Sequence, residues 1–339
     1  MKFTLVITTF NSEKYIEEAI KSALIQTRKP DEIIISDDNS SDRTIEICTR
    51  FIPEVQIVIN KNGPSGYVNA YNYALKIGTG DYITILHYDD YLTPEFFQNV
   101  ERAFNEHPEC RFLYVGCNYV NKINVEIKPY PWPKSKEAKR IAGSEYAKKY
   151  LKSIINSNHI HRCPGVVINR SLINDGMLFR EQAGIINDDD FFLRAGKYTD
   201  ILGIDFPFAS VRLHDESETG KLEKLALQLA GGWHFQYEEY IYGNTILDEE
   251  CGLLLLSFAF NDLTTALNYS LKNNSDQDVI KIREIMNKLE KLSGKKIENE
   301  IRYFYRRHLW YLFKNNKTDK AKLLNKLILS GRGIKSTFK

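Results

Sequence analysis

Short apolar runs alternate with amphipathic stretches along the first part of the chain. Residues Phe3–Thr9 form an apolar run rich in β-branched side chains. The stretch that follows places four apolar residues on one helical face, Ile16, Ile20, Ala23 and Leu24. This pattern predicts a strand followed by a helix.

The same strand, loop and helix unit then recurs. Further strand candidates cover residues 32–36, 55–59 and 81–86, and the first two are each followed by a helical pattern. Repeated units of this kind predict a mostly parallel sheet flanked by helices, in the manner of a Rossmann fold. The polar loops TTFN, SDDNS, NGPSG and HYDD follow the four strands in turn. Because ligands bind outside the carboxyl ends of parallel strands, these loops predict a binding site.

The pattern changes twice further along the chain. Residues 111–128 predict further strand, and the Pro- and Lys-rich stretch YPWPKSKEAKR predicts a loop beside a cleft. From residue 221 onward the pattern is helical. We therefore expect an α/β domain over 1–220, with halves at about 1–110 and 111–220, and an appended helical region over 221–339.

Composition excludes several classes of protein. Hydrophobic residues are 43% and charged residues 27% of the 339, which is typical of a globular enzyme. A net charge of +2 gives no whole-chain argument for a nucleic-acid partner, and we expect none. The five cysteines are odd in number and scattered, and the apolar start of the chain is too short to span a membrane. These features predict a cytoplasmic location.

The first two loops contain groups suited to a nucleoside. Asp38 can accept a hydrogen bond from a base imide, and Phe10 can stack on the ring. The alternative is that side chains of these loops only cap the helices that follow, for which the candidates are Asn11, Ser12, Asp38, Ser40 and Asp42.

The loop after the fourth strand contains paired carboxylates. Asp89 and Asp90 end the strand, and Pro94 opens the next helix. Carboxylates at the crevice are hard-oxygen ligands for Mg²⁺ or Mn²⁺, which would neutralise a diphosphate leaving group. The alternative is a helix start whose acids face the positive end of the helix dipole.

A run of three carboxylates, Asp188–Asp190, opens a later helix whose Phe192 and Ala195 should face inward. One carboxylate can point into the cleft as a general base while another caps the helix. A solvated acidic helix start is the competing interpretation. His214, two residues after Arg212 in a strand-like stretch, is either structural or a ligand to metal or phosphate.

These residues carry a resemblance to the family 2 glycosyltransferases of the GT-A type, over residues 3 to about 217. The segments TTFN with a later QT, DEIIISDDNSSDRT, NGPSGYVNAYNYAL, GDYI and LHYDDYLTPEFF occur in the family's order and approximate spacing. Each segment is weakly specific, but their combination is specific. The resemblance implies an inverting transferase that moves a sugar from a nucleotide diphosphate donor, usually a UDP-sugar, to an acceptor hydroxyl.

The resemblance also implies site residues. The donor nucleotide site would comprise Thr8, Phe10, Asn11, Asp38, Asn72 and Asp89. Asp89 matches the family's metal-binding acid, for Mn²⁺ or Mg²⁺, and His214 and His87 are further candidate metal ligands. With Arg194 as the reference, Asp188 aligns with the catalytic base, and a slip of one residue would select Asp189.

The acceptor is expected on the other side of the cleft. Trp132 is a candidate acceptor contact because aromatic faces pack against sugar rings, and Asp190 is a second candidate. Family habit suggests a glycan or lipid-linked acceptor in surface polysaccharide synthesis.

Two positions depart from the family pattern. His87 stands where an aspartate is usual, and Tyr71 stands where an arginine usually precedes Asn72. Imidazole favours softer divalent ions than carboxylate does, and the second change removes a positive charge near the donor phosphates. They motivate one rival interpretation, a nucleotide-sugar binding protein without turnover. A nucleotidyltransferase is a second rival, but TTFNSEKY lacks its glycine-rich phosphate loop.

The last segment mixes basic and aromatic residues in IRYFYRRHLWYLFKNN. This mix suits either peripheral contact with the inner face of the membrane, close to a lipid-linked acceptor, or a helix packed on the catalytic domain or a homodimer partner.

Overall fold

The computed structural model describes residues 1–61, 66–155, 158–214, 222–273 and 275–293. The strands are β1 Phe3–Thr9, β2 Glu32–Asp37, β3 Gln56–Ile59, β4 Tyr82–His87, β5 Tyr91–Leu92, β6 Phe112–Val120, β7 Glu126–Lys128, β8 Ala138–Ile141, β9 Val166–Asn169 and β10 Ile201–Arg212. The helices are α1 Ile16–Leu24, α2 Thr44–Thr49, α3 Tyr67–Ile77, α4 Phe96–Glu106, α5 Gly143–Ile155, α6 Arg170–Asn174, α7 Asn187–Tyr198, α8 Leu222–Ile241, α9 Glu249–Asn273 and α10 Asp276–Ser293. Two short 3₁₀ helices are η1 Cys163–Gly165 and η2 Glu181–Ile186.

The first four predicted strands form the parallel part of one sheet. They lie in the order β3, β2, β1, β4, and each neighbouring pair is parallel. Their carboxyl ends therefore meet at one edge of the sheet, as the sequence predicts.

Beyond β4 the sheet is mixed. β9 runs antiparallel to both β4 and β6, whereas β10 is parallel to β6. The predicted strand over residues 111–128 is an antiparallel pair, β6 and β7. The predicted cleft loop contains a strand of its own, since β8 pairs antiparallel with β10. The mixed α/β class is confirmed.

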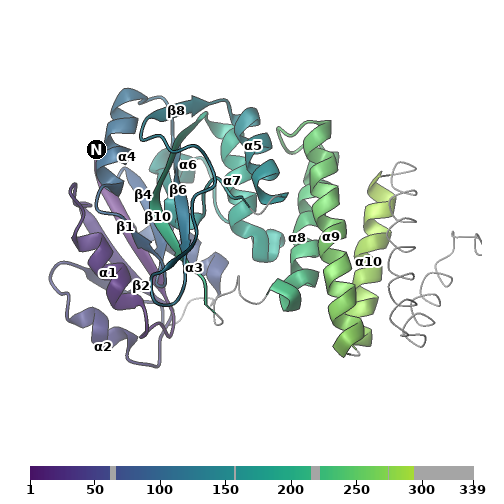
Figure 1. Cartoon of the computed structure of the whole chain (residues 1–339), viewed down its shortest axis with the longest axis horizontal. Helices are drawn as coiled ribbons and strands as arrows, with labels where there is room; N and C mark the ends of the chain where they lie inside the picture. Colours follow the sequence, from purple (N-terminus) through teal and green to yellow (C-terminus); the bar gives the residue numbers. More distant parts are fainter. Residues whose placement is uncertain (62–65, 156–157, 215–221, 274, 294–339) are drawn as a thin grey trace, which may run out of the picture.

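Alternating side chains bury both faces of the sheet. On β1, Phe3, Leu5 and Ile7 pack in one core cluster with α1, α2 and α4, whereas Val6 packs in the other with the remaining large helices. The sheet is thus a central layer with helices on both faces (Figure 1). Burial on both faces explains why the strands are continuous apolar runs.

Helices α8, α9 and α10 lie side by side beyond α7 (Figure 1). Gly232 of α8 allows a close approach to η2, because a Cβ there would lie 2.7 Å from the Ala183 carbonyl oxygen. Among the described helices, none is long and apolar enough to cross a membrane. The basic aromatic segment after residue 300 lies outside the described residues.

Candidate active site

The carboxyl ends of β1, β2 and β4 bring the predicted loops together. In the sheet register Thr8 lies beside Ser36 of β2 and His87 of β4. Phe10 follows β1 and is 55% exposed, so its ring is available to stack on a planar ligand. The adjacent β-strand ends thus form one edge of a candidate nucleotide site.

Asp38 lies at the end of β2 with its carboxylate fixed from two sides. It accepts a hydrogen bond from the Asn60 side-chain amide at 3.1 Å and one from the Gly66 backbone N–H at 3.3 Å. Its own backbone N–H donates to the Thr9 carbonyl at 2.9 Å. This carboxylate is therefore held in a fixed orientation, and Asp42 rather than Asp38 accepts the N–H of Thr44 at the start of α2, at 3.0 Å.

Asn11 ties the first two loops together. Its backbone has a φ of 48°, a left-handed conformation that asparagine tolerates better than most residues. Its N–H donates to the Ser40 hydroxyl at 2.8 Å, and its side-chain oxygen accepts from the Ser41 N–H at 2.9 Å. Asn11 thus holds the loop geometry around the candidate donor site.

Three candidate metal ligands cluster at the end of β4, and a fourth, His214, contacts one of them. One ligand atom from each of His87, Asp89 and Asp90 lies within 4.8 Å of the others. The Asp89 carboxylate is also 2.9 Å from His214 Nε2, which arrives from the end of β10. The cluster of mutually close ligand atoms thus holds two of the predicted metal ligands, His87 and Asp89, together with Asp90, which is 3% exposed, while the third predicted ligand, His214, contacts Asp89. Burial and the nearby charge of Asp89 raise the pKa of Asp90.

Arg212 forms hydrogen bonds that hold Asp89 and Asp90 in place. It is 2% exposed, its Nε donates to the Asp89 carbonyl at 2.8 Å, and its backbone N–H donates to the Asp90 carboxylate at 2.9 Å. Its guanidinium also forms an ion pair with Glu18 at 2.6 Å. Arg212 therefore orients the ligands and is itself already paired.

The two residues that depart from the family pattern contact each other. The Tyr71 hydroxyl lies 2.9 Å from His87 Nε2, and the two rings stack with their centroids 5.4 Å apart. The other ring nitrogen of His87 lies 3.5 Å from Asp90. Burial raises the pKa of Tyr71, and the charges of Asp188 and Asp89 add to this effect. Tyr71 therefore lies within electrostatic reach of both the metal cluster and the acidic run.

Asn72 is held in a reciprocal pair with the backbone of Phe179. Its amide nitrogen donates to the Phe179 carbonyl at 2.9 Å, and its oxygen accepts the Phe179 N–H at 2.8 Å. The side chain thus joins α3 to the segment before η2.

The three acids that open α7 have different environments. Asp188 is partly exposed, and its carboxylate accepts the Asp189 N–H at 2.9 Å. Asp189 is buried and accepts the Tyr150 hydroxyl at 2.6 Å. Burial and the charge of Asp188 raise the pKa of Asp189 to about 7. Phe192 and Ala195 are buried as predicted.

Asp190 is a correction to the sequence analysis. It is 0% exposed, so its carboxylate does not reach an acceptor. It accepts the Gln236 side-chain amide at 2.6 Å and forms ion pairs with Arg180 and, at 2.9 Å, Arg194. Arg180 pairs in turn with Glu239 at 2.7 Å. Asp190 thus joins α7 to α8 instead of facing the cleft.

This network predicts a large effect on stability. Replacing Asp190 by alanine leaves Arg180 and Arg194 without their shared buried partner, and we expect it to lower the free energy of unfolding by about 3 kcal/mol. Denaturant unfolding of the full chain measures this. Asp175→Ala, which removes an exposed ion pair with Arg111, is the control and should cost less than about 1 kcal/mol. Equal losses in the two variants would contradict the buried role of Asp190.

The buried Asp189 carboxyl predicts a pH-dependent loss of stability. Because its pKa is about 7 in the fold, above the value of an unfolded chain, the folded state binds the extra proton and loses stability as pH rises from about 4 to about 7. Asp189→Asn keeps an acceptor for Tyr150 and cannot ionise. The melting temperature of this variant relative to the natural protein should therefore rise between pH 5 and pH 8, and a constant difference would contradict the prediction.

Trp132 is partly buried beside the second half of the sheet. Its indole N–H donates to the Asn158 carbonyl at 2.9 Å, and the Lys149 ammonium lies 5.7 Å from the ring centroid. These contacts fix the orientation of the ring, so one face is already occupied by the lysine. Its contact with an acceptor stays a prediction.

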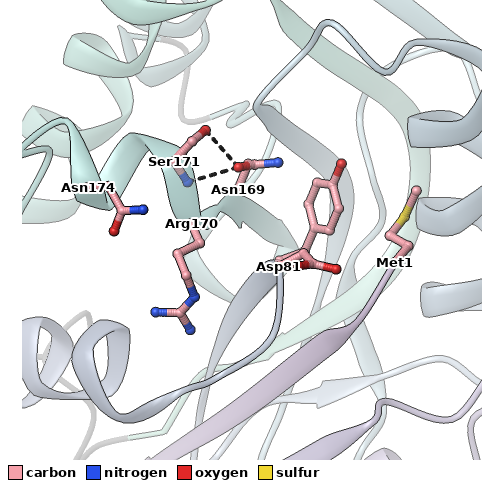
Figure 2. Close-up of a pocket in the computed structure, with 7 residues that line it drawn as sticks. Met1, Asp81, Asn169, Arg170, Ser171 and Asn174 are labelled. Atoms are coloured by element: carbon pink, nitrogen blue, oxygen red, sulfur yellow. Dashed lines mark hydrogen bonds between the residues drawn. The ribbon is translucent and has the colours of Figure 1, made fainter.

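A separate hollow lies at the opposite edge of the sheet (Figure 2). It is lined by residues at the amino end of β4 and the carboxyl end of β9, among them Asp81 and Asn169. The side-chain oxygen of Asn169 already accepts a hydrogen bond from the Ser171 N–H, at 2.9 Å. The amino ends of the parallel strands are not where such sheets bind ligands, and the hollow lies away from the acidic clusters.

Sequence reasoning missed two residues beside the acidic run. Tyr150 comes from α5 and Arg162 from the loop before β9, and Asp188 and Asp189 both influence the protonation of each. Tyr150 lies in an ordinary amphipathic helix pattern, so nothing local marks it. Arg162 stands between two histidines and a CPG turn, a local cluster that could have singled it out.

The sheet and the acidic residues at its strand ends agree with the predicted GT-A type of glycosyltransferase. The sequence profile described as "Glycosyl transferase family 2" matches residues 4–175, which is half of the chain. The chain therefore belongs to glycosyl transferase family 2.

Individual relatives agree with this assignment. The poly(ribitol-phosphate) beta-N-acetylglucosaminyltransferase TarS of Staphylococcus aureus is 31% identical over 114 residues, which is 32% of this chain and 19% of that protein. The hyaluronan synthase of Pasteurella multocida is 25% identical over 303 residues, 86% of this chain and 28% of the synthase. The chain thus spans less than a third of the length of these curated relatives.

Two solved structures show the fold. TarS residues 1–349 in complex with UDP-GlcNAc superpose with a TM-score of 0.63 at 16% identity, covering 98% of this chain and 92% of that one. The mannosyltransferase PcManGT of Pyrobaculum calidifontis, in complex with GDP-Man and Mn²⁺, gives a TM-score of 0.52 at 15% identity, with 99% and 88% covered. The appended helices lie within the superposed part of the TarS fragment.

Proposed function

We propose that this protein is an inverting transferase that moves a sugar from a UDP-sugar to a hydroxyl of a glycan or lipid-linked acceptor. The observation that carries the proposal is the acidic cluster of His87, Asp89 and Asp90, which Tyr71 contacts through His87, with the partly exposed Asp188 within electrostatic reach of Tyr71. The cluster suits a diphosphate bound through a metal, and Asp188 suits a base for the attacking hydroxyl. The structural neighbour that binds UDP-GlcNAc supports the choice of UDP.

The ligand set fits a divalent metal. The candidate ligands are the carboxylates of Asp89 and Asp90 and the imidazoles of His87 and His214, and this mixture of oxygen and nitrogen donors suits Mn²⁺ better than Mg²⁺. His87 Nε2 is occupied by Tyr71, so His87 would offer its other nitrogen, which now faces Asp90. A bound ion would stabilise the negative charge that develops on the departing diphosphate. The structural neighbour in complex with Mn²⁺ supports this assignment.

Residues at the ends of β1 and β2 would bind the nucleoside of the donor. Asp38 accepts the base imide and Phe10 stacks on the base, while Thr8 and Asn11 shape the loop between them. Asn72 joins α3 to the segment before η2 through its hydrogen bonds with Phe179.

Asp188 is the proposed base, because it is the acid of α7 with solvent access, whereas Asp189 is buried against Tyr150. It takes the proton from the acceptor hydroxyl as that oxygen attacks the anomeric carbon from the face opposite the nucleotide. The bond to the diphosphate breaks in the same step, and the configuration inverts.

Three further features belong to the proposal. Residues 1–220 would form the catalytic domain and 221–339 an appended helical region. Trp132 would contact the acceptor. The setting would be surface polysaccharide synthesis at the cytoplasmic face of the membrane, where the segment after residue 300 could make peripheral contact or join a homodimer.

Calorimetric titration of UDP with Mn²⁺ and with chelator tests the proposed donor site. We expect binding that requires the metal, followed by slow release of UDP from a UDP-sugar in a screen without acceptor. Metal-dependent binding with no release from any UDP-sugar would favour a binding protein without turnover. Absence of binding under both conditions would overturn the choice of UDP.

A further inference from the structure

Arg162 lies near the start of α7, because the ring of its neighbour His161 stacks on Tyr150, whose hydroxyl donates to Asp189. Arg162 immediately precedes η1, whose Gly165 packs so closely on β6 that a Cβ there would lie 2.7 Å from the Val115 carbonyl oxygen. The loop therefore has little freedom to move Arg162. Arg162 is partly exposed, so it is accessible to solvent.

The other arginines around the site are already paired with carboxylates. Arg180 and Arg194 share Asp190, and Arg212 pairs with Glu18. Within the part of the chain that the structure describes, Arg162 forms no ion pair, and its one side-chain partner is His159 Nδ1 at 3.4 Å.

His159 does not compensate the charge of Arg162. Burial, with the charge of Arg162, lowers the pKa of His159 well below its usual value, so the imidazole is neutral and can only accept one hydrogen bond. A guanidinium carries five N–H donors in a planar fork. Most of the donors of Arg162 are thus left for a ligand or for water.

The guanidinium of Arg162 stays protonated in this position. Burial alone would lower its pKa, but the nearby Tyr119 and the charges of Asp188 and Asp189 outweigh burial and raise the pKa. Neither acid lies close enough to form an ion pair. The guanidinium is therefore within electrostatic reach of the Asp188 carboxylate, and the two groups come from separate elements, the loop before β9 and the start of α7.

We propose that Arg162 binds an oxyanion of the acceptor, a phosphodiester or carboxylate next to the attacking hydroxyl. The inference rests on the proposed function, because a base must touch the hydroxyl that it deprotonates, and a cation beside that base meets the same molecule. The donor diphosphate already has the Asp89 cluster for its charge. A guanidinium fork matches the planar or tetrahedral oxygens of such an anion by two parallel hydrogen bonds.

The test uses the full chain saturated with UDP and Mn²⁺, so that the donor site is filled, and glycerol 3-phosphate as the probe. Calorimetry should show that glycerol 3-phosphate binds and that neutral glycerol binds far more weakly. Arg162→Gln should weaken the binding of glycerol 3-phosphate tenfold or more, and Arg162→Lys should weaken it less. Arg140→Gln is the control, since Arg140 pairs with Asp200 on the surface, and it should leave binding unchanged.

Three results would overturn the inference. One is equal binding of glycerol 3-phosphate and glycerol to the natural protein, and another is unchanged binding in Arg162→Gln. The third is a higher donor KM for UDP-sugar hydrolysis in Arg162→Gln with phosphate binding intact, which would assign the guanidinium to the donor. Failure of the proposed function looks different, because the natural protein would then bind no UDP and release none from any UDP-sugar. UDP affinity also shows that the variants are folded.

Discussion

Replacing Asp188 by asparagine should lower sugar transfer about 1000-fold, because a positioned general base contributes roughly 100- to 10,000-fold to a rate. The amide keeps the size of the side chain and can still accept the Asp189 N–H, but it cannot take a proton from the acceptor hydroxyl. UDP binding should be unaffected, since the donor contacts lie at the ends of β1, β2 and β4. The measurements are kcat for transfer and the dissociation constant of UDP in the same preparation.

Asp189→Asn is the matched variant for this experiment. Its acid lies one residue along the same helix, but it is buried and bonded to Tyr150. We expect a reduction of no more than about tenfold, through altered charge around Asp188. If Asp189→Asn instead abolished transfer while Asp188→Asn spared it, the alignment would be displaced by one residue and Asp189 would be the base.

The sequence predicts the parallel half of the fold well because local and tertiary signals agree there. Strands buried on both faces read as apolar runs, and each is followed by an amphipathic helix. The order β3, β2, β1, β4 then places the loops with Asp38 and Asp89 at one edge. The second half is harder, because β8 and β9 are four residues each and are defined by their antiparallel partners.

The same contrast holds within the site. The spacing of the acidic run predicts a helix start with inward apolar residues, but it cannot say which acid faces the cleft. That depends on partners distant in sequence, Tyr150 for Asp189 and Gln236 for Asp190. The sequence pattern therefore offers Asp190 as an acceptor contact, whereas in the fold it is buried and bonded to Gln236 of α8.

The two residues that depart from the family pattern, Tyr71 and His87, contact each other in the structure. His87 and Tyr71 each replace a charged residue of the family pattern, and the sequence treats them as independent departures. In the fold they stack and share a hydrogen bond. The phenol hydroxyl of Tyr71 thus lies directly against the imidazole of His87 at the edge of the acidic cluster.

Replacing Asp89 by alanine should abolish metal-dependent UDP binding and lower turnover about 100-fold or more. Asp89 is the carboxylate that contacts both the ligand cluster and His214, so its loss removes a charged ligand and releases the histidine. The negative charge on the leaving diphosphate then lacks its stabilising ion, and such charge stabilisation acts chiefly in the transition state. Calorimetry with Mn²⁺ and UDP, together with kcat, measures both effects.

His214→Ala makes the cause of this loss testable. It removes one neutral ligand and leaves the carboxylate, so UDP affinity should fall less than in Asp89→Ala and should recover at higher Mn²⁺ concentration. Asp89→Ala should not recover, because it removes the charged ligand that joins the His87 and Asp90 side of the site to His214, and the one carboxylate left, Asp90, is buried. If both variants bound UDP equally well with chelator present, the nucleotide would be held without metal, and the cluster around Asp89 would have to stabilise the leaving group in another way.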